Sequence, residues 1–540
     1  MFRSTLAFVI FFWMTSIPAQ STPLGNPAAP KTGTFTINLG GEPTTINPIT
    51  STDVYAQNVH SYVLDSLLSR NEDSYAWEPA LASEWNISKD GKEFTFKLRP
   101  GATFHDGKPV SVDDVKFSFD VIFDPKFQTA HLRPYYEGIA KVEIVDPQTV
   151  KFTAKEKYFR NFDSAAGLTV IPKHIYGDPN TKQNLNHTLI GSGPYLIDKY
   201  ELGKRIVLKR NPNFWGNTDP NFKGQYNFER IVLRFVKENT IALEMLKKGD
   251  LDYEGFDPET YTQKAVGPEW GKKVFKVMAQ NKSPKGYGFV AWNLENELFK
   301  DKRVRIALAH LLNRALIIEK FRFGMSLLAT GPWYQQSEYA SPNVEPFEFD
   351  PKKALDLLRR AGWSDADKNG VLEKGEAAAK GEFRFTLLTA NADTMKYWTL
   401  YKEDAKKAGV DIEIKLVEWN SFVKLMDEKK FDAVTLGWGG GAVDLDPKQI
   451  WHSSSAVAGG SNFISFKNAE VDKLIDKART LMTKEERIPV MRKAYELIAA
   501  EAPYLFLFND KNVLYSHAAK IQKVKDTFNF AVGTNYWWNQ

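Results

Sequence analysis

Residues 79–119 are PALASEWNISKDGKEFTFKLRPGATFHDGKPVSVDDVKFSF, and this stretch holds the densest run of local structure signals in the chain. Its segments 84–87 and 93–99 flank an Asp-Gly pair, which is typical of a tight turn, and the second segment alternates apolar with polar residues. A half-buried β-hairpin is therefore predicted. After a second turn, Ser111 stands three residues before Asp114, as in a capping box, so we expect a helix to begin there.

This stretch also resembles the signature of a known protein family. It contains the words LA-x-x-W, FHDG-x-P and DV-x-FS in this order. Residues 42–48, EPTTINP, are similar to the family word E-P-x-x-L-D-P with two mild changes, and GSGPY at 191–195 and RNPNFWG at 210–216 follow downstream. On these words the chain resembles the family 5 extracellular solute-binding proteins, the peptide and nickel group.

The resemblance implies an α/β fold, namely a two-lobed periplasmic binding protein of type II with an additional inserted domain. We assign lobe I to residues 34–70, 189–287 and 505–540, the inserted domain to 71–188, and lobe II to 288–504. The crossings near 287 and 505 are expected to form the hinge. A solute held between two such lobes contacts both only when they close, so closure reports that the site is filled.

Two helices are expected from apolar periodicity. One covers the apolar positions from Val59 to Leu68, and the other runs from Arg303 to Ile318.

The amino-acid composition limits the classes of protein to which this chain can belong. The 540 residues suffice for two or more domains, and 43% hydrophobic with 25% charged residues is typical of a globular chain. Lysine and arginine total 71 against 66 aspartate and glutamate, and the two signs are interleaved. The net charge of +5 therefore forms no concentrated basic footprint, and we expect no nucleic-acid partner.

The first twenty residues, 1–20, have the pattern of a secretory signal peptide. Arg3 precedes the apolar run 6–14, and small residues follow at 17–21, where cleavage is expected. The run is shorter than the roughly 20 residues of a membrane span, and a retained anchor is the alternative interpretation. Residues 21–33 are rich in proline, glycine and small residues and are expected to form a flexible arm.

The sequence contains no cysteine, which excludes disulfides, cysteine-type zinc sites and the lipidated cysteine that anchors many exported binding proteins. We therefore predict a periplasmic protein that is secreted by a cleaved signal peptide and is not lipidated. We further expect a monomer whose membrane partner is the permease of an ABC transporter.

The resemblance also implies which segments contact the solute. In relatives, an extended peptide pairs through its backbone with the loop after the first strand and with a Gly-Trp strand of the second lobe. Carried over to this chain, the ligand-binding residues are Glu42, Pro43, Thr44, Gly437, Trp438 and Gly439. Alternation over 431–438 also predicts a strand that ends at a glycine-rich edge. The alternative for Trp438 is a core aromatic.

Peptide-binding relatives place an aspartate shortly after this tryptophan, where it pairs with the α-amine of the ligand. In this sequence the position falls on Val443 or, with a shifted gap, on Asp444. We hypothesise that Asp444 is the amine anchor. The alternative is that Asp444 caps the turn before a helix at 447–451.

Residues 365–376 fit the calcium-loop pattern D-x-[DN]-x-[DN]-G-x5-E. The oxygen ligands of such a loop would be Asp365, Asp367, Asn369, Val371 and Glu376. A strand rather than a helix is expected after the loop, so bound calcium would be structural. The alternative is a solvated Asp/Gly turn without metal.

No catalytic constellation is found in the sequence. The 8 histidines include no pair at zinc-helix spacing, and neither a G-x-S-x-G elbow nor a phosphate-loop word is present. We therefore expect no enzyme and no required cofactor. Structural calcium in the loop 365–376 stays one of two alternatives, the other being a turn without metal. The favoured function is capture of a peptide or peptide-like solute for an ABC importer. The alternatives are a non-peptide solute, such as a nickel chelate, an oligosaccharide or an opine-like compound, and a secreted hydrolase with an unrecognised site.

Overall fold

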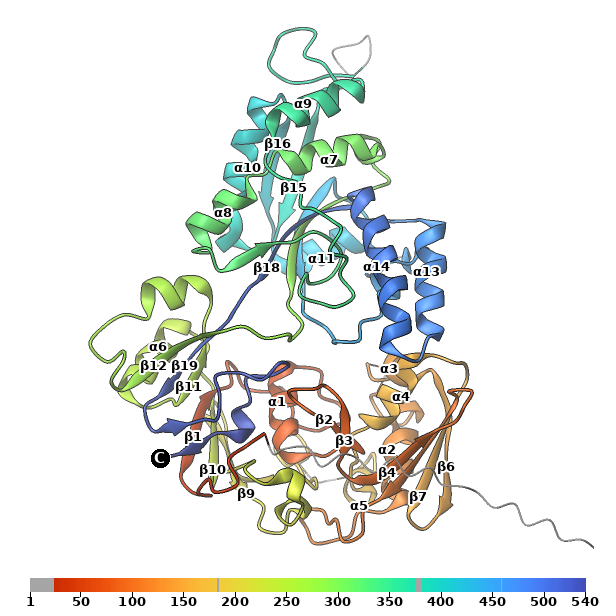
Figure 1. Cartoon of the computed structure of the whole chain (residues 1–540), viewed down its shortest axis with the longest axis vertical. Helices are drawn as coiled ribbons and strands as arrows, with labels where there is room; N and C mark the ends of the chain where they lie inside the picture. The colour runs from red at the N-terminus through yellow and green to blue at the C-terminus, as the bar shows by residue number, and fades with distance from the viewer. Residues whose placement is uncertain (1–23, 130, 182–183, 375–380, 458) are drawn as a thin grey trace, which may run out of the picture.

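The protein is described from a computed structural model, in which two lobes follow each other along the long axis (Figure 1). The described residues are 24–129, 131–181, 184–374, 381–457 and 459–540. The expected signal peptide, 1–20, and residues 21–23 of the expected arm lie outside the described residues. Within the described part of the chain, no helix combines the length and the apolar character that a membrane crossing requires.

A seven-stranded mixed sheet forms the centre of the lower lobe (Figure 1). In spatial order its strands are β12 (Val274–Ala279), β19 (Val513–Ala518), β11 (Tyr253–Gly255), β1 (Thr34–Asn38), β10 (Arg230–Arg234), β9 (Arg205–Arg210) and β8 (Tyr195–Glu201). β1 pairs in parallel with β10 and β11. Segments from the start, the middle and the end of the chain thus meet in one lobe, as the resemblance implies.

A four-stranded antiparallel sheet lies in the inserted domain and contains the predicted hairpin. Its order is β4 (Ala82–Ile87), β5 (Glu93–Leu98), β7 (Thr149–Ala154) and β6 (Ile139–Asp146). Gly91 supplies the turn with a φ of 70°. Ser111 and Asp114 form both bonds of a capping box at the start of α2 (Val112–Phe123). The hairpin and the capped helix are therefore confirmed.

The inserted domain shares a hydrophobic core with the lower lobe. Phe94 and Phe96 of its central strand β5 belong to the same hydrophobic cluster as Leu208 and Ile231 of the lower-lobe sheet. Burial of this continuous apolar core stabilises the packing of the two sheets against each other.

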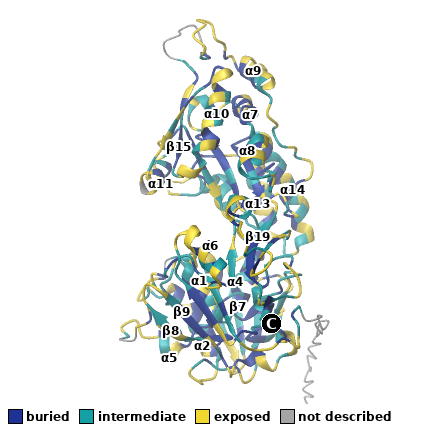
Figure 2. Cartoon of the chain, turned by 90° about the vertical axis from the view of Figure 1, so that its left-hand side faces the viewer, coloured by how far each residue is buried: buried dark blue, intermediate teal, exposed yellow. Residues whose placement is uncertain are grey.

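A six-stranded sheet forms the upper lobe. Its order is β14 (Ser326–Leu328), β18 (Tyr504–Asp510), β13 (Tyr287–Trp292), β17 (Ala433–Trp438), β15 (Arg384–Thr389) and β16 (Asp411–Leu416). Its buried residues divide into two clusters, one around Trp292 and Trp398 and the other around Phe289 and Tyr495. Buried residues, dark blue in Figure 2, accordingly lie on strands inside the lobe, while helices cover both faces.

The remaining elements cover these sheets and join them. The helices are α1 (Val54–Val63), α3 (Arg133–Tyr136), α4 (Phe159–Ala166), α5 (Lys173–Tyr176), α6 (Asn239–Lys248), α7 (Lys302–His310), α8 (Arg314–Phe321), α9 (Pro351–Arg360), α10 (Met395–Lys407), α11 (Trp419–Asp427), α12 (Lys448–Trp451), α13 (Ala469–Thr480) and α14 (Lys484–Glu501). Two short pairs of strands are β2 (Leu68–Arg70) with β3 (Trp77–Pro79), and β20 (Ile521–Gln522) with β21 (Trp538–Asn539).

Both helices expected from periodicity are shorter than predicted. α1 ends at Val63, whose carbonyl accepts a hydrogen bond from the main-chain N–H of Gly193 (3.0 Å). The second helix is interrupted before Asn313, whose side chain accepts from the N–H of Leu316 and caps a new helix, α8. In each case a tertiary or capping contact ends a helix that the apolar pattern would continue.

The second hinge crossing also lies later than expected. β18 pairs with β13 and β14 inside the six-stranded sheet over Tyr504–Asp510. The chain therefore leaves the upper lobe at 511–512, not near 505, and enters the lower sheet with β19. The first crossing precedes β13, which begins at Tyr287, as expected.

Glu72 carries a buried carboxyl where the turn between β2 and β3 meets the C-terminal segment. It accepts a hydrogen bond from Asn535 (3.3 Å), and its Oε2 is buried without a hydrogen-bond partner among the described residues. Burial raises the pKa of Glu72 to about 7. The folded protein thus holds this proton to a higher pH than the unfolded chain does.

We expect the free energy of unfolding to fall as pH rises from about 4.5 to about 7, by up to about 3 kcal/mol for this one group. Glu72→Gln should remove that part of the pH dependence, because the amide keeps the bond to Asn535 without a charge. Guanidinium unfolding at pH 5 and pH 8 measures the difference. The exposed Glu137→Gln serves as the control, and an unchanged difference in Glu72→Gln would contradict the assignment.

Candidate functional site

Strand β17 has a partly free edge in the upper lobe. It pairs with β13 over its whole length, from Ala433 to Trp438. With β15 on its other side it pairs only at Ala433 and Val434. From Thr435 to Trp438 this second edge has no strand partner among the described residues. Main-chain N–H and C=O groups on a free edge can pair with an added extended chain.

Three glycines lie at the end of β17 and just after it, and they differ in the space around them. Gly437 and Gly439 are exposed, and a Cβ built on Gly439 would meet nothing within 4 Å. Gly440, in contrast, packs tightly, since its Cβ would lie 2.3 Å from the Pro284 carbonyl oxygen. Gly439 therefore leaves room for a ligand, whereas Gly440 is required by packing.

Trp438 takes part in the core of the upper lobe. Its ring lies 5.9 Å from that of Phe289 and 6.2 Å from that of Phe463, measured between centroids. It is only half-buried, and its buried Nε1 lies beside the Tyr504 hydroxyl. The indole thus packs on the core and keeps part of its surface accessible.

The loop after β1 holds Glu42, Pro43 and Thr44. The Glu42 carboxylate accepts from the main-chain N–H of Gly203 in the β8–β9 turn (3.0 Å), and it lies beside the Tyr200 hydroxyl. Pro43 is buried and Thr44 exposed. No hydrogen bond or ion pair between described residues joins this loop to β17, which lies in the other lobe.

Asp444 lies in a hydrogen-bonded group at the end of the glycine-rich segment. Its Oδ1 accepts from the Tyr339 hydroxyl (2.6 Å) and from Arg487 (3.0 Å). Its Oδ2 accepts no hydrogen bond from any described residue. The predicted alternative, in which Asp444 caps the helix at 447–451, is wrong, because Asp446 accepts from the main-chain N–H of Lys448 at that helix start.

The segment 443–446 is also where the upper lobe meets the inserted domain. The Tyr158 hydroxyl of the inserted domain donates to Asp446 (2.6 Å), and Arg479 pairs with the same carboxylate. The Arg479 guanidinium lies over the Tyr158 ring at 4.0 Å, and that of Arg487 lies over the neighbouring Phe159 at 4.1 Å. Figure 1 shows the corresponding ends of α13 and α14 beside α4.

These interlobe contacts were not predicted from the sequence. Tyr158 and Phe159 form an aromatic pair at the start of α4, and the two arginines lie eight residues apart on consecutive helices. An aromatic pair at a helix start has no specific sequence pattern, so only the tertiary structure reveals its arginine partners.

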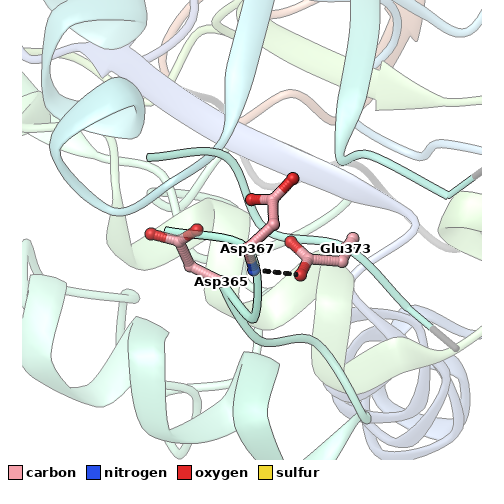
Figure 3. A group of neighbouring side chains, drawn as sticks. All are labelled: Asp365, Asp367 and Glu373. Atoms are coloured by element: carbon pink, nitrogen blue, oxygen red, sulfur yellow. Dashed lines mark hydrogen bonds between the residues drawn. The ribbon is translucent and has the colours of Figure 1, made fainter. Parts of the chain in front are cut away.

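The calcium-like loop brings together part of the predicted ligand set. Ligand oxygens of Asp365, Asp367 and Glu373 lie within 4.8 Å of one another (Figure 3). The Asn369 amide donates to Asp367 (3.0 Å). The predicted ligand Glu376 lies outside the described residues. Glu373 was not predicted as a ligand and is added by the structure. Val371 donates its N–H to Asn369.

Sequence and fold comparisons agree with this architecture. The chain matches Bacterial extracellular solute-binding proteins, family 5 Middle, over residues 76–460. It is 28% identical over 497 residues to the oligopeptide-binding protein AppA of Bacillus subtilis, covering 89% of this chain and 87% of AppA. The structure of AppA in complex with a nonapeptide superposes with a TM-score of 0.73 at 26% identity, covering 95% of this chain and all of that one.

Relatives named for other solutes are similar to a comparable degree. NikZ from Campylobacter jejuni in complex with Ni(L-His) has a TM-score of 0.73 at 26% identity, covering 94% of this chain and 100% of NikZ. The heme-binding protein A of Haemophilus influenzae is 27% identical over 489 residues, covering 86% of this chain and 84% of that protein. With the family match spanning most of the chain, and with the two lobes and inserted domain described above, this chain belongs to the family 5 bacterial extracellular solute-binding proteins, a family of binding proteins.

Proposed function

We propose that this protein captures a peptide or peptide-like solute between its two lobes and delivers it to the permease of an ABC importer. The observation that carries the proposal is the free edge of β17 from Thr435 to Trp438, followed by an open Gly439. An extended peptide can add to such an edge by main-chain hydrogen bonds whatever its side chains are. The likeness to AppA in its nonapeptide complex supports the same solute class.

Closure of the lobes is the signal that the permease reads in this proposal. A solute that contacts both the Glu42 loop and β17 favours the closed arrangement by its differential affinity. The protein acts as a monomer in the periplasm, without lipid and without catalysis. Export is supported by the Arg3-led apolar run at the start of the chain, and the absence of a lipid anchor by the absence of cysteine.

A metal chelate is the second candidate solute. It is favoured by the likeness to NikZ in complex with Ni(L-His), which matches AppA in TM-score and identity. Native mass spectrometry of protein released gently from periplasm, followed by denaturation, separates the two candidates. A heterogeneous set of short peptides supports the first, whereas a single non-peptide mass would reject it in favour of the second.

Within the peptide proposal, the Oδ2 of Asp444 is the anchor for the ligand's α-amine. Asp444→Asn should weaken binding of a peptide with a free amine about 10- to 100-fold, the value of one charge-assisted hydrogen bond. The asparagine oxygen still accepts from Tyr339 and Arg487, so the site keeps its shape. Calorimetric titration with one peptide in free and N-acetylated form gives the comparison.

The acetylated peptide is the internal control, because it carries no ammonium for Asp444 to bind. Its affinity should be the same in both proteins. An equal loss for the free and acetylated peptides would mean that Asp444 acts only through Arg487, and the amine anchor would then be rejected.

A further inference from the structure

The loop between α9 and β15 gathers three carboxylates at the far end of the upper lobe (Figure 1). Oxygens of Asp365, Asp367 and Glu373 lie within 4.8 Å of one another, and Figure 3 shows the three side chains around one point. Asp365 and Asp367 are exposed, whereas Glu373 is 4% exposed. Three like charges this close repel one another unless a cation lies between them.

The buried carboxylate of Glu373 is only half satisfied. Its Oε1 accepts hydrogen bonds from the main-chain N–H groups of Ala366 (2.5 Å) and Asp367 (3.2 Å). Its Oε2 is buried and has no hydrogen-bond partner among the described residues. A charged oxygen removed from water without a partner is costly to the fold. This oxygen is the independent sign that the acidic group is built for a ligand.

The backbone around Glu373 is fixed on both sides. The N–H of Leu372 donates to the Gly409 carbonyl (2.8 Å), and the N–H of Phe383 donates to the Leu372 carbonyl (2.6 Å). Phe383 in turn stacks on Trp363 at a centroid distance of 4.6 Å. Glu373 is thus held in place by the core of the lobe, while the two aspartates approach it from the exposed turn.

We propose that this loop binds one calcium ion through the carboxylates of Asp365, Asp367 and Glu373. Calcium takes six to eight oxygen ligands at about 2.3–2.6 Å, so two ligands on opposite sides of one ion lie about 4.8 Å apart. Magnesium requires a shorter, octahedral arrangement and keeps its own waters. The ion is structural, since the loop lies far from β17. Bound calcium would hold together the loop that connects α9 to β15.

The test is calcium titration of the full chain after treatment with EDTA and transfer to metal-free buffer. Isothermal titration calorimetry should give one calcium ion per chain, and calcium should raise the melting temperature. Glu373→Gln should weaken calcium binding at least ten-fold and lose the thermal shift. Asp356→Asn, an exposed acidic residue of the preceding helix α9, is the matched control and should bind calcium as the wild type does.

Asp365→Asn and Asp367→Asn provide a second pair of variants, because both residues are exposed and their replacement leaves the core intact. Each should weaken calcium binding at least ten-fold, which keeps the test decisive if Glu373→Gln does not fold. The absence of binding heat in the wild type would overturn the proposal. So would calcium affinity within two-fold of the wild type in all three variants, or equal affinity for magnesium. Peptide binding, measured separately, should not change in any of them.

Discussion

Replacing Gly439 by tryptophan should reduce peptide affinity by at least about 100-fold while leaving the fold intact. That loss corresponds to about 2.7 kcal/mol of binding free energy. Gly439 does not have a positive φ, and a Cβ at this position meets nothing within 4 Å, so the backbone accepts a side chain. The indole would then fill the space beside the free edge of β17, where the backbone of an extended peptide pairs in the proposed function.

The effect is measured by calorimetric titration with a mixed nonapeptide library, and the melting temperature reports on the fold. Val145→Trp introduces the same bulk at an exposed position of β6, and it should bind peptides as the wild type does. Wild-type affinity in Gly439→Trp would show that the solute does not use this edge of β17, and the peptide proposal would lose the observation that carries it.

Local signals in the sequence were sufficient for elements whose ends are set by their own residues. The hairpin around Gly91 and the capping box of Ser111 with Asp114 appear where they were predicted, because a positive φ and a reciprocal cap are properties of four to six neighbouring residues. The two-lobed fold with an inserted domain was likewise predicted, since the family words extend along most of the chain.

Features that depend on distant contacts were placed less accurately. α1 stops at Val63 because Gly193, far along the chain, donates to its carbonyl, and the hinge lies after Asp510 because β18 pairs with β13. Neither contact can be predicted from the periodicity of apolar residues. The position of Glu373 could not be predicted from the sequence either. This buried acid is held beside the two exposed aspartates by the packing of Leu372 and Phe383.

The candidate binding residues also divide into those whose placement follows from local sequence and those whose placement depends on distant contacts. Trp438 and its glycines were named from the resemblance, and the strand that carries them was predicted from alternation, so their placement at a sheet edge follows from sequence. The partners of Asp444 did not follow, because Tyr339 and Arg487 come from segments 105 and 43 residues away. Which oxygen of Asp444 remains for a ligand is therefore known only from the folded arrangement.

Arg487→Ala should destabilise the protein more than any other single change at this interface. Arg487 is buried, pairs with Asp444 at 3.0 Å, and donates to the carbonyls of Leu481 and Met482. Its guanidinium also covers Phe159 of the inserted domain. Alanine leaves the Asp444 carboxylate in a poorly solvated site without its cation, and removal of one partner of a buried pair costs about 3–5 kcal/mol of unfolding free energy.

Guanidinium unfolding followed by tryptophan fluorescence and by circular dichroism measures this loss. Arg492→Ala is the matched control on the same helix, because the bond that its side chain donates to the Glu338 carbonyl is exposed. This variant should change stability by no more than about 0.5 kcal/mol. The double variant with Asp444→Ala should recover part of the loss, since no unpaired charge remains. A double variant as unstable as the sum of the two single variants would show that the charge pair contributes nothing. The other contacts of Arg487, with Phe159 and with the carbonyls of Leu481 and Met482, would then account for its effect.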